Sequence, residues 1–378
     1  MLTRRERLMA TLRGETVDRP AVSFYEVGGI PMDPDDPSPF NVHNGPGWRA
    51  LLHLAEEETD LIRMRAPALR PAPGNRIDDF RTVETEMRDG SRFVRTTWRV
   101  GGRSLTSVTR QDPDVDTVWQ LEHLLKEPAD VEAYLQLPDE AFLLEISVEP
   151  LQAEEARLGD AGIVMVDIAD PLCHAASLFS MADYTVLALT EPTLFHRLLE
   201  QAARHVTPVV ETVARAFPGH LWRVVGSEYA SEPMLPGRLY REYAVRYTQP
   251  IVETIQRYGG FARIHSHGRL RRILPDIASM APAGLDPIEP PPQGDMALIE
   301  VRRAIGAQTV LFGNIEASEI ELLDADAFEA RARQALDEGT SGQGRGFVLM
   351  PSACPYGREI SSRVVANYET MVRLAKAG

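Results

Sequence analysis

Two histidines and a cysteine have the donor atoms, and the positions in the sequence, that a metal site needs. His265 and His267 stand two residues apart in the segment FARIHSHG, and Cys354 follows the apolar run FVLMPS. Two imidazoles at positions i and i+2 on leaving a strand point the same way. Zinc takes borderline-soft nitrogen and sulfur donors, and catalytic zinc sites combine three protein ligands with an open position. The pattern therefore predicts a catalytic zinc site.

Glu289, in the sequence PIEP, adds an oxygen donor between the histidine pair and the cysteine. The alternative interpretation is an inert Cys354 beside a hydrogen-bonded histidine pair. A metal-dependent hydrolase of the H-x-H type is excluded, because it needs two further histidines after the pair. No histidine follows His267 in this sequence.

Other polar residues stand where strands are expected to end. Tyr25, Glu26 and Asn314 are candidates for binding a substrate. Asp167 and Glu228 are candidates for acid–base work or for orienting a substrate, and their structural alternative is to hold neighbouring arginines. Asp170 precedes Pro171, a context in which aspartate caps a helix, so we expect it to be a helix N-cap.

Eight short β-rich runs alternate with amphipathic segments, which is typical of a parallel sheet. The runs are PAVSFY (21–26), DLIRMRA (60–66), GIVMVD (162–167), LWRVVG (221–226), FARIHS (261–266), GLDPIEP (284–290), TVLFGN (309–314) and FVLMPS (347–352). Helical patterns cover 48–58, 192–215, 238–258, 269–280, 297–305, 325–338 and 360–376. Eight strand–helix repeats predict a single (β/α)₈ TIM barrel domain over residues 1–378, and its ligand-handling groups should lie at the carboxyl ends of the strands.

One segment interrupts this alternation. Residues 83–110 alternate polar and apolar side chains around two turn signals, Asp89-Gly90 and Gly101-Gly102. Such a pattern predicts a small antiparallel excursion after the second strand, within the same α/β domain.

The composition narrows the range of partners. With 44% hydrophobic and 25% charged residues the chain is an ordinary globular protein, and its net charge of −15 argues against nucleic acid and anionic membranes as partners. A charged start, MLTRRERLMATLRGE, and two cysteines favour a cytoplasmic location. Thr3 and Glu6 form a capping-box pattern at that start.

The chain resembles the uroporphyrinogen decarboxylase superfamily over nearly its whole length. The resemblance rests on TRRERLMATLRGETVDRPAV at the start and on WQLEHLLKEPADVEAYLQLP, which is similar to the family's pre-barrel helix pair. In the second half it rests on GRLYREYAVRYTQPIVETIQRYGGFARIHSHG, IGAQTVLFGNIEAS and GFVLMPSACPYGREISSRVVANYETMV, which occur in the family's order. The decarboxylases of the family carry an Arg-Gln-Ala-Gly-Arg loop after the first strand. Here the equivalent stretch, residues 25–29, contains no arginine.

The resemblance is closer to the branch of zinc- and cobamide-dependent methyltransferases. Their zinc is held by His-x-Cys and a later Cys, which implies ligand roles for His265 and Cys354. His267 replaces the middle cysteine, and this makes the site less negative by one charge. Cobalamin-independent methionine synthases have a related site with a glutamate, and Glu289 matches its place. No Asp-x-His-x-x-Gly corrinoid signature is present, so any cobamide must be carried on a partner protein.

These features together predict a zinc-dependent methyltransferase that acts on a methoxylated or methyl-thiol small molecule with a separate corrinoid protein. A less negative zinc is the stronger Lewis acid, which slightly favours an oxygen-bearing substrate. Two alternatives stay open: a decarboxylase acting on a small carboxylated substrate, and a non-catalytic binding barrel.

Overall fold

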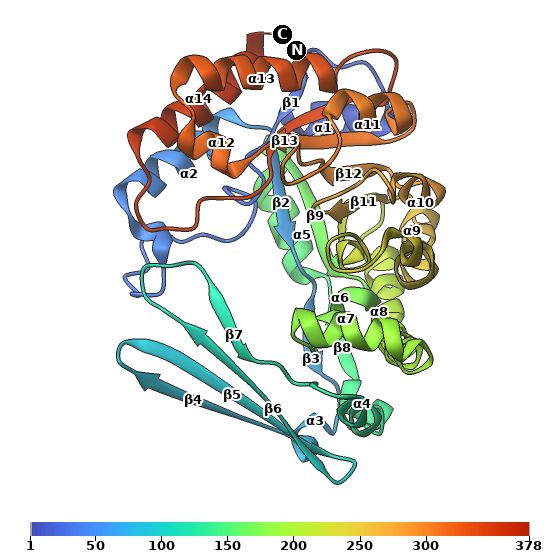
Figure 1. Cartoon of the computed structure of the whole chain (residues 1–378). Coiled ribbons are helices and arrows are strands. Elements are labelled where there is room, and N and C mark those ends of the chain that lie inside the picture. Colours follow the sequence, from blue (N-terminus) through green and yellow to red (C-terminus); the bar gives the residue numbers. More distant parts are fainter. Residues whose placement is uncertain (1, 378) are drawn as a thin grey trace.

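A curled parallel sheet organises the chain. In the computed structural model, which describes residues 2–377, this sheet has eight strands in the order β1-β14-β13-β12-β11-β10-β9-β2 (Figure 1). The strands are β1 (Ala21–Val22), β2 (Leu61–Arg65), β9 (Gly162–Ala169), β10 (Leu221–Val225), β11 (Phe261–Ser266), β12 (Gly284–Pro287), β13 (Val310–Ile315) and β14 (Phe347–Pro351). All eight predicted strands are confirmed in their predicted positions along the chain.

Helices follow the strands and cover the sheet. They are α1 (Arg4–Arg13), α2 (Pro46–Glu58), α5 (Glu149–Leu158), α6 (Pro171–Ala176), α7 (Met181–Thr190), α8 (Pro192–Ala216), α9 (Arg246–Arg257), α10 (Leu274–Ser279), α11 (Leu298–Ile305), α12 (Ala317–Leu322), α13 (Ala325–Gly339) and α14 (Ser362–Ala377). Helix α1 begins with the predicted capping box of Thr3 and Glu6. Within the described residues, none of the helices combines the length and the apolar character needed to cross a membrane.

Two predicted strands are shorter in the structure than in the sequence pattern. β1 ends at Val22 rather than at residue 26, and β12 ends at Pro287 rather than at residue 290. Tyr25 and Ile288 have positive φ angles of 58° each, which no strand accommodates. The chain therefore turns early at both places. Helix α10 also starts later than predicted, at Leu274.

A hydrophobic cluster on the inner face shows that the sheet curls. Its members come from alternate positions of the strands, as the period of two requires. Ile62 and Met64 of β2 belong to this cluster, and so do Val348 and Met350 of β14. These strands stand far apart in the order of the sheet, so the sheet must curl to bring them together.

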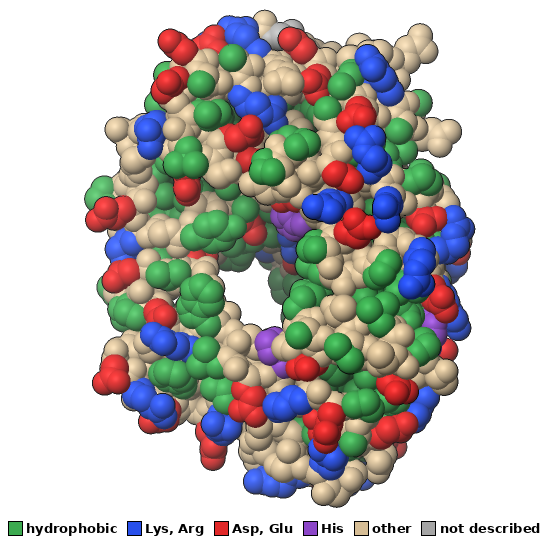
Figure 2. All heavy atoms as spheres, viewed as in Figure 1, with side chains coloured by type: hydrophobic (Ala, Val, Ile, Leu, Met, Phe, Trp, Pro, Cys, Tyr) green, Lys and Arg blue, Asp and Glu red, His purple; other side chains and the backbone are tan. Residues whose placement is uncertain are grey.

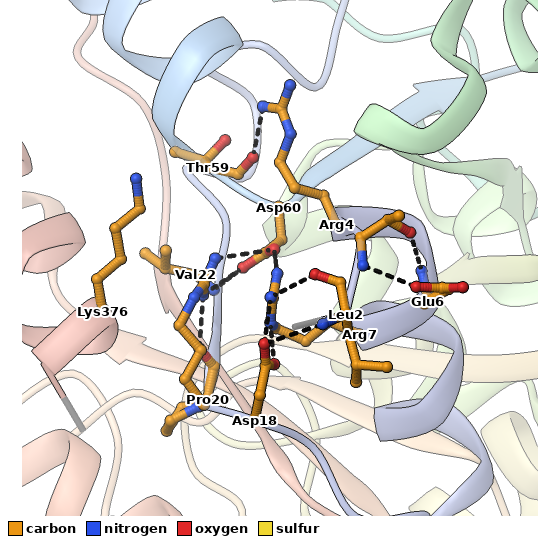
Figure 3. A network of polar contacts seen from close by, with 12 residues as sticks. Leu2, Arg4, Glu6, Arg7, Asp18, Pro20, Val22, Thr59, Asp60 and Lys376 are labelled. Atoms are coloured by element: carbon orange, nitrogen blue, oxygen red, sulfur yellow. Dashed lines mark hydrogen bonds and ion pairs between the residues drawn. The ribbon is translucent and has the colours of Figure 1, made fainter.

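Asp60 joins the two ends of the sheet, β1 and β2 (Figure 3). Its backbone N–H donates to the carbonyl of Val22 at 2.8 Å, and its carboxylate accepts from the N–H of Val22 at 3.0 Å. The fully buried carboxylate also pairs with Arg7 at 2.6 Å and with Arg19 at 2.8 Å. This network ties helix α1 and the Asp-Arg-Pro segment before β1 to the start of β2.

The antiparallel excursion is present and is larger than predicted. Strands β4 (Arg81–Arg88), β5 (Ser91–Val100), β6 (Arg103–Gln111) and β7 (Val118–Glu122) form one antiparallel sheet, and its first two turns lie at the predicted glycines. Strands β3 (Ala68–Pro71) and β8 (Leu144–Ser147) pair at its base, beside α3 (Ile77–Phe80) and α4 (Pro128–Tyr134). The helix pair expected from the resemblance over 119–138 was wrong in its first helix, because residues 119–122 belong to β7, and α4 is the helix present there. We call residues 68–147 the insertion.

The insertion is fastened to the loop that follows Cys354. Val115 forms an isolated antiparallel bridge with Gly357, and the N–H of Asp116 donates to the carbonyl of Tyr356 at 3.0 Å. Figure 2 shows the consequence, an opening through the molecule between the insertion and the rest of the chain. The insertion thus reaches across the carboxyl end of the sheet from β2 to the loop after β14.

Asp170 is the N-cap of α6, as predicted. One oxygen accepts from the N–H of Cys173 at 2.7 Å and the other from the hydroxyl of Thr248 at 2.9 Å. Burial of this side chain raises the pKa of its carboxyl to about 7.

This raised pKa predicts how Asp170→Asn changes stability with pH. Between about pH 4 and pH 7 the folded wild type binds more protons than the unfolded chain, so its stability falls as the pH rises through this window. The amide of the variant does not ionise. Measured by urea unfolding, the variant should therefore gain up to a few kcal/mol relative to the wild type between pH 4 and pH 7. A stability difference that stays constant with pH would contradict the assignment.

Candidate active site

His265 lies on the inner face of β11 within a buried charged cluster. Its Nδ1 is 2.7 Å from a carboxylate oxygen of Asp286, its neighbour in the register of β12. Arg263, two residues earlier on the same face, lies with its Nε 2.9 Å from the other oxygen of Asp286, and both side chains are completely buried. Burial opposes the charged form of Asp286, but Arg263 and His265 outweigh it and lower the pKa of the carboxyl. Asp286 therefore holds His265 with Nε2 left for another partner.

His267 forms a second imidazole–carboxylate pair beside the first. Its Nδ1 is 2.7 Å from one oxygen of Glu289, and the other oxygen accepts the N–H of Gly268 at 2.6 Å. The rings of His265 and His267 stand nearly perpendicular, with centroids 4.6 Å apart. Burial lowers the pKa of His267, but the hydrogen bond and charge of Glu289 more than offset this and raise it. His265 and His267 therefore lie side by side, and Glu289 contacts His267.

Cys354 is buried beside Glu26, on the loop after β14. Its N–H donates to a carboxylate oxygen of Glu26 at 3.0 Å. Burial and the Glu26 carboxylate raise the pKa of the Cys354 thiol well above its ordinary value. The thiol is therefore protonated in this arrangement, and it would have to lose its proton to bind a metal.

Tyr25 and Asp167 meet at Arg223, a residue that the sequence analysis did not single out. Arg223 of β10 stands opposite Asp167 of β9 and binds it through Nε at 2.6 Å and Nη2 at 3.3 Å. It also donates to the hydroxyl of Tyr25. The ring of Tyr25 stacks on that of His265, with centroids 6.0 Å apart. Asp167 therefore holds a neighbouring arginine.

Glu228 and Asn314 lie at the ends of their strands but make contacts within the protein. Glu228, on the short 3₁₀ helix Ser227–Ala230, accepts the N–H of Gly226 at 3.0 Å. Asn314 is buried, donates to the carbonyl of Ile288 at 3.2 Å and accepts from Arg331 at 3.1 Å. Their roles toward a substrate stay predictions.

Glu316 is a further acidic residue that the sequence analysis missed. It is buried just after β13, where one oxygen accepts the hydroxyl of Ser352 at 3.1 Å and the other has no partner among the described residues. Burial and the charge of Glu289 raise the pKa of its carboxyl to about 7. Such a group exchanges protons near neutral pH. In the sequence, Glu316 could have been found as the charged residue that ends the apolar run VLFGNIE.

The two histidines are oriented as metal ligands usually are, but the four predicted zinc ligands do not form one site. Imidazoles that bind metals usually give their other ring nitrogen to a carboxylate, and both histidines do so here. The two oxygens of Glu289 are already engaged. Among residues 2–377, however, no group of three or more His, Cys, Asp and Glu side chains is placed so that it could hold a metal ion. The four predicted ligands are therefore not assembled as one set in this structure.

Comparisons with known proteins agree on the family and the fold. A family model described as uroporphyrinogen decarboxylase (URO-D) matches residues 115–366. A methyltransferase from Methanosarcina mazei has a similar structure, with a TM-score of 0.62, 16% identity and 99% of each chain covered. A D-psicose 3-epimerase from Clostridium cellulolyticum H10 has a TM-score of 0.35 at 12% identity, over 60% of this chain and 79% of that one, too low to support an argument. No curated protein matches the sequence significantly.

Proposed function

Because this chain belongs to the uroporphyrinogen decarboxylase family, we propose that it is a methyltransferase of that family with a (β/α)₈ barrel. It would take a methyl group from a methoxylated or methyl-thiol small molecule and pass it to a cobamide on a separate protein. The observation that carries the proposal is the pair of adjacent imidazoles, each held by a carboxylate through Nδ1. The methyltransferase from Methanosarcina mazei supports the fold that this requires.

We assign the zinc to His265, His267 and Cys354. When bound, zinc would supply a Lewis acid for the oxygen or sulfur that carries the methyl group. Glu289 would act as the carboxylate that orients His267, since both of its oxygens are already engaged. Because three donors are not placed together here, the assignment requires Cys354 to turn from Glu26 toward the histidines.

The other residues at this end of the sheet would bind and orient the substrate. Asp286 fixes His265, and Arg223 fixes the hydroxyl of Tyr25 over the inner face. Glu316, with a pKa of about 7, would hold the proton that the leaving oxygen or sulfur takes up. Methyl transfer breaks the bond from carbon to that atom, and the proton completes the demethylated product.

Decarboxylation of a polycarboxylate such as uroporphyrinogen fits this site less well. Its recognition needs cations, and the two arginines on the inner face, Arg223 and Arg263, are already paired with Asp167 and Asp286. Glu26 and Glu289 add carboxylates nearby. An acidic surrounding of this kind repels substrate carboxylates.

One experiment with two arms tests the proposal. Zinc-loaded protein is given a reduced cobalamin with a series of methoxylated and methyl-thiol compounds, and in parallel it is given uroporphyrinogen. We expect methylation of the cobalamin from at least one donor, seen in its absorption spectrum, and no coproporphyrinogen. His265→Ala should abolish the methylation. Formation of coproporphyrinogen would place the chain among the decarboxylases instead.

A further inference from the structure

A cavity lies away from the histidine pair, between the insertion and helices α6 and α8. Its volume is about 650 Å³, and its walls include Leu69 of β3, Leu144 of β8 and Ile168 of β9. Ile168 directly follows Asp167, and successive residues of a strand point to opposite faces. Asp167 binds Arg223 on the inner face, so the cavity lies on the outer side of the sheet.

Three residues that line this cavity each carry a buried side-chain polar atom that has no hydrogen-bond partner among the described residues. These atoms are Nε of Arg81, Oε1 of Gln201 and Nε2 of His205. Gln201 is only 3% exposed. A buried polar group without a partner costs about 1–3 kcal/mol, and folded proteins leave few of them. Three such atoms on residues that line one cavity therefore point to a polar group of a ligand.

The charged and apolar side chains that line the cavity indicate the charge and polarity of its ligand. Arg81 is the one ionic side chain among its lining residues, and no Asp or Glu lines it although the chain carries a net charge of −15. The facing carboxylate of Asp78 is mostly exposed and lies 3.8 Å from Arg81. Burial lowers the pKa of His174 and His205, which keeps both rings neutral. The remaining walls are largely aliphatic and aromatic, and include Phe142 stacked on His205.

We propose that this cavity binds a small apolar monocarboxylate, an alkyl or aryl acid. Its carboxylate would accept hydrogen bonds from Arg81, from His205 in its Nε2–H tautomer, and from the Gln201 amide, which can present its NH₂ group at the position of the unpartnered atom. Its apolar body would lie along α8 against Leu198, Val206 and Val209. The site is independent of the methyltransferase proposal and shares none of its residues.

Titration calorimetry with octanoate tests the proposal on the full chain. We expect one octanoate per chain and a rise in melting temperature with its concentration, because a ligand of the folded state stabilises it. The neutral 1-octanol should bind at least about tenfold more weakly, since it lacks the charge-assisted hydrogen bonds to Arg81. Suberate should also bind more weakly, because its second carboxylate would lie against apolar walls.

Matched variants locate the site. Arg81→Gln should weaken octanoate binding at least about tenfold, whereas Arg88→Gln, an exposed arginine on the same strand, should leave it unchanged. Ala202→Phe should fill the cavity and abolish binding. The melting temperature without ligand shows whether each variant is folded. Absence of octanoate binding to the wild type, or equal binding by wild type, Arg81→Gln and Ala202→Phe, would overturn the proposal.

Discussion

Cys354→Ser is expected to lose most of the zinc from a protein that otherwise binds about one ion per chain. A hydroxyl is a far poorer zinc donor than a thiolate at neutral pH, so the affinity should fall by about 100-fold or more. His265→Ala and His267→Ala should behave in the same way. Elemental analysis after dialysis against a weak chelator measures the loss.

Two further variants separate ligands from bystanders. Cys173→Ser is the matched control, because Cys173 lies on α6 and burial keeps its thiol protonated. It should retain its zinc. Glu289→Gln should weaken zinc binding by only about 10–100-fold, as expected for a carboxylate that orients His267. Equal zinc in the wild type and in Cys354→Ser would place Cys354 outside the metal site and overturn the assignment of the three zinc ligands.

The strands could be predicted because each is an apolar run of strand length bounded by turn residues. Segments such as GIVMVD and FVLMPS are buried on both faces, and their alternation with helices admits few topologies. The histidine pair could also be placed, since two residues at positions i and i+2 at the end of a buried strand lie on the same face. The ends of β1 and β12 could not be predicted from the sequence, because the positive φ angles at Tyr25 and Ile288 depend on tertiary packing rather than on residue type.

The sequence could name the polar residues of the site but not their partners. For Asp167 the sequence left open either acid–base work or a structural role in holding arginines, and Arg223 binds it from the neighbouring strand. Glu289 looked like a metal ligand, yet it accepts from His267 and Gly268. Such pairings depend on the register between strands, which no local pattern of residues encodes. The sequence signal for these pairings was an arginine within an apolar run, as in LWRVV and FARIH.

Asp286→Asn is expected to lower the free energy of unfolding by about 3–5 kcal/mol, because it leaves Arg263 buried without a counter-charge. Asp167→Asn is the matched control: it breaks the pair with Arg223, but the Arg223 side chain is 14% exposed whereas Arg263 is 0% exposed, so water can reach the arginine that remains. Its cost should be about 1 kcal/mol of unfolding free energy.

Adding Arg263→Met to Asp286→Asn should recover most of the lost stability, since no buried charge is then left unpaired. Urea unfolding measures all three. If Asp286→Asn costs no more than Asp167→Asn, then Arg263 does not depend on this carboxylate as its counter-charge, and the buried ion pair is not what holds Asp286 against His265.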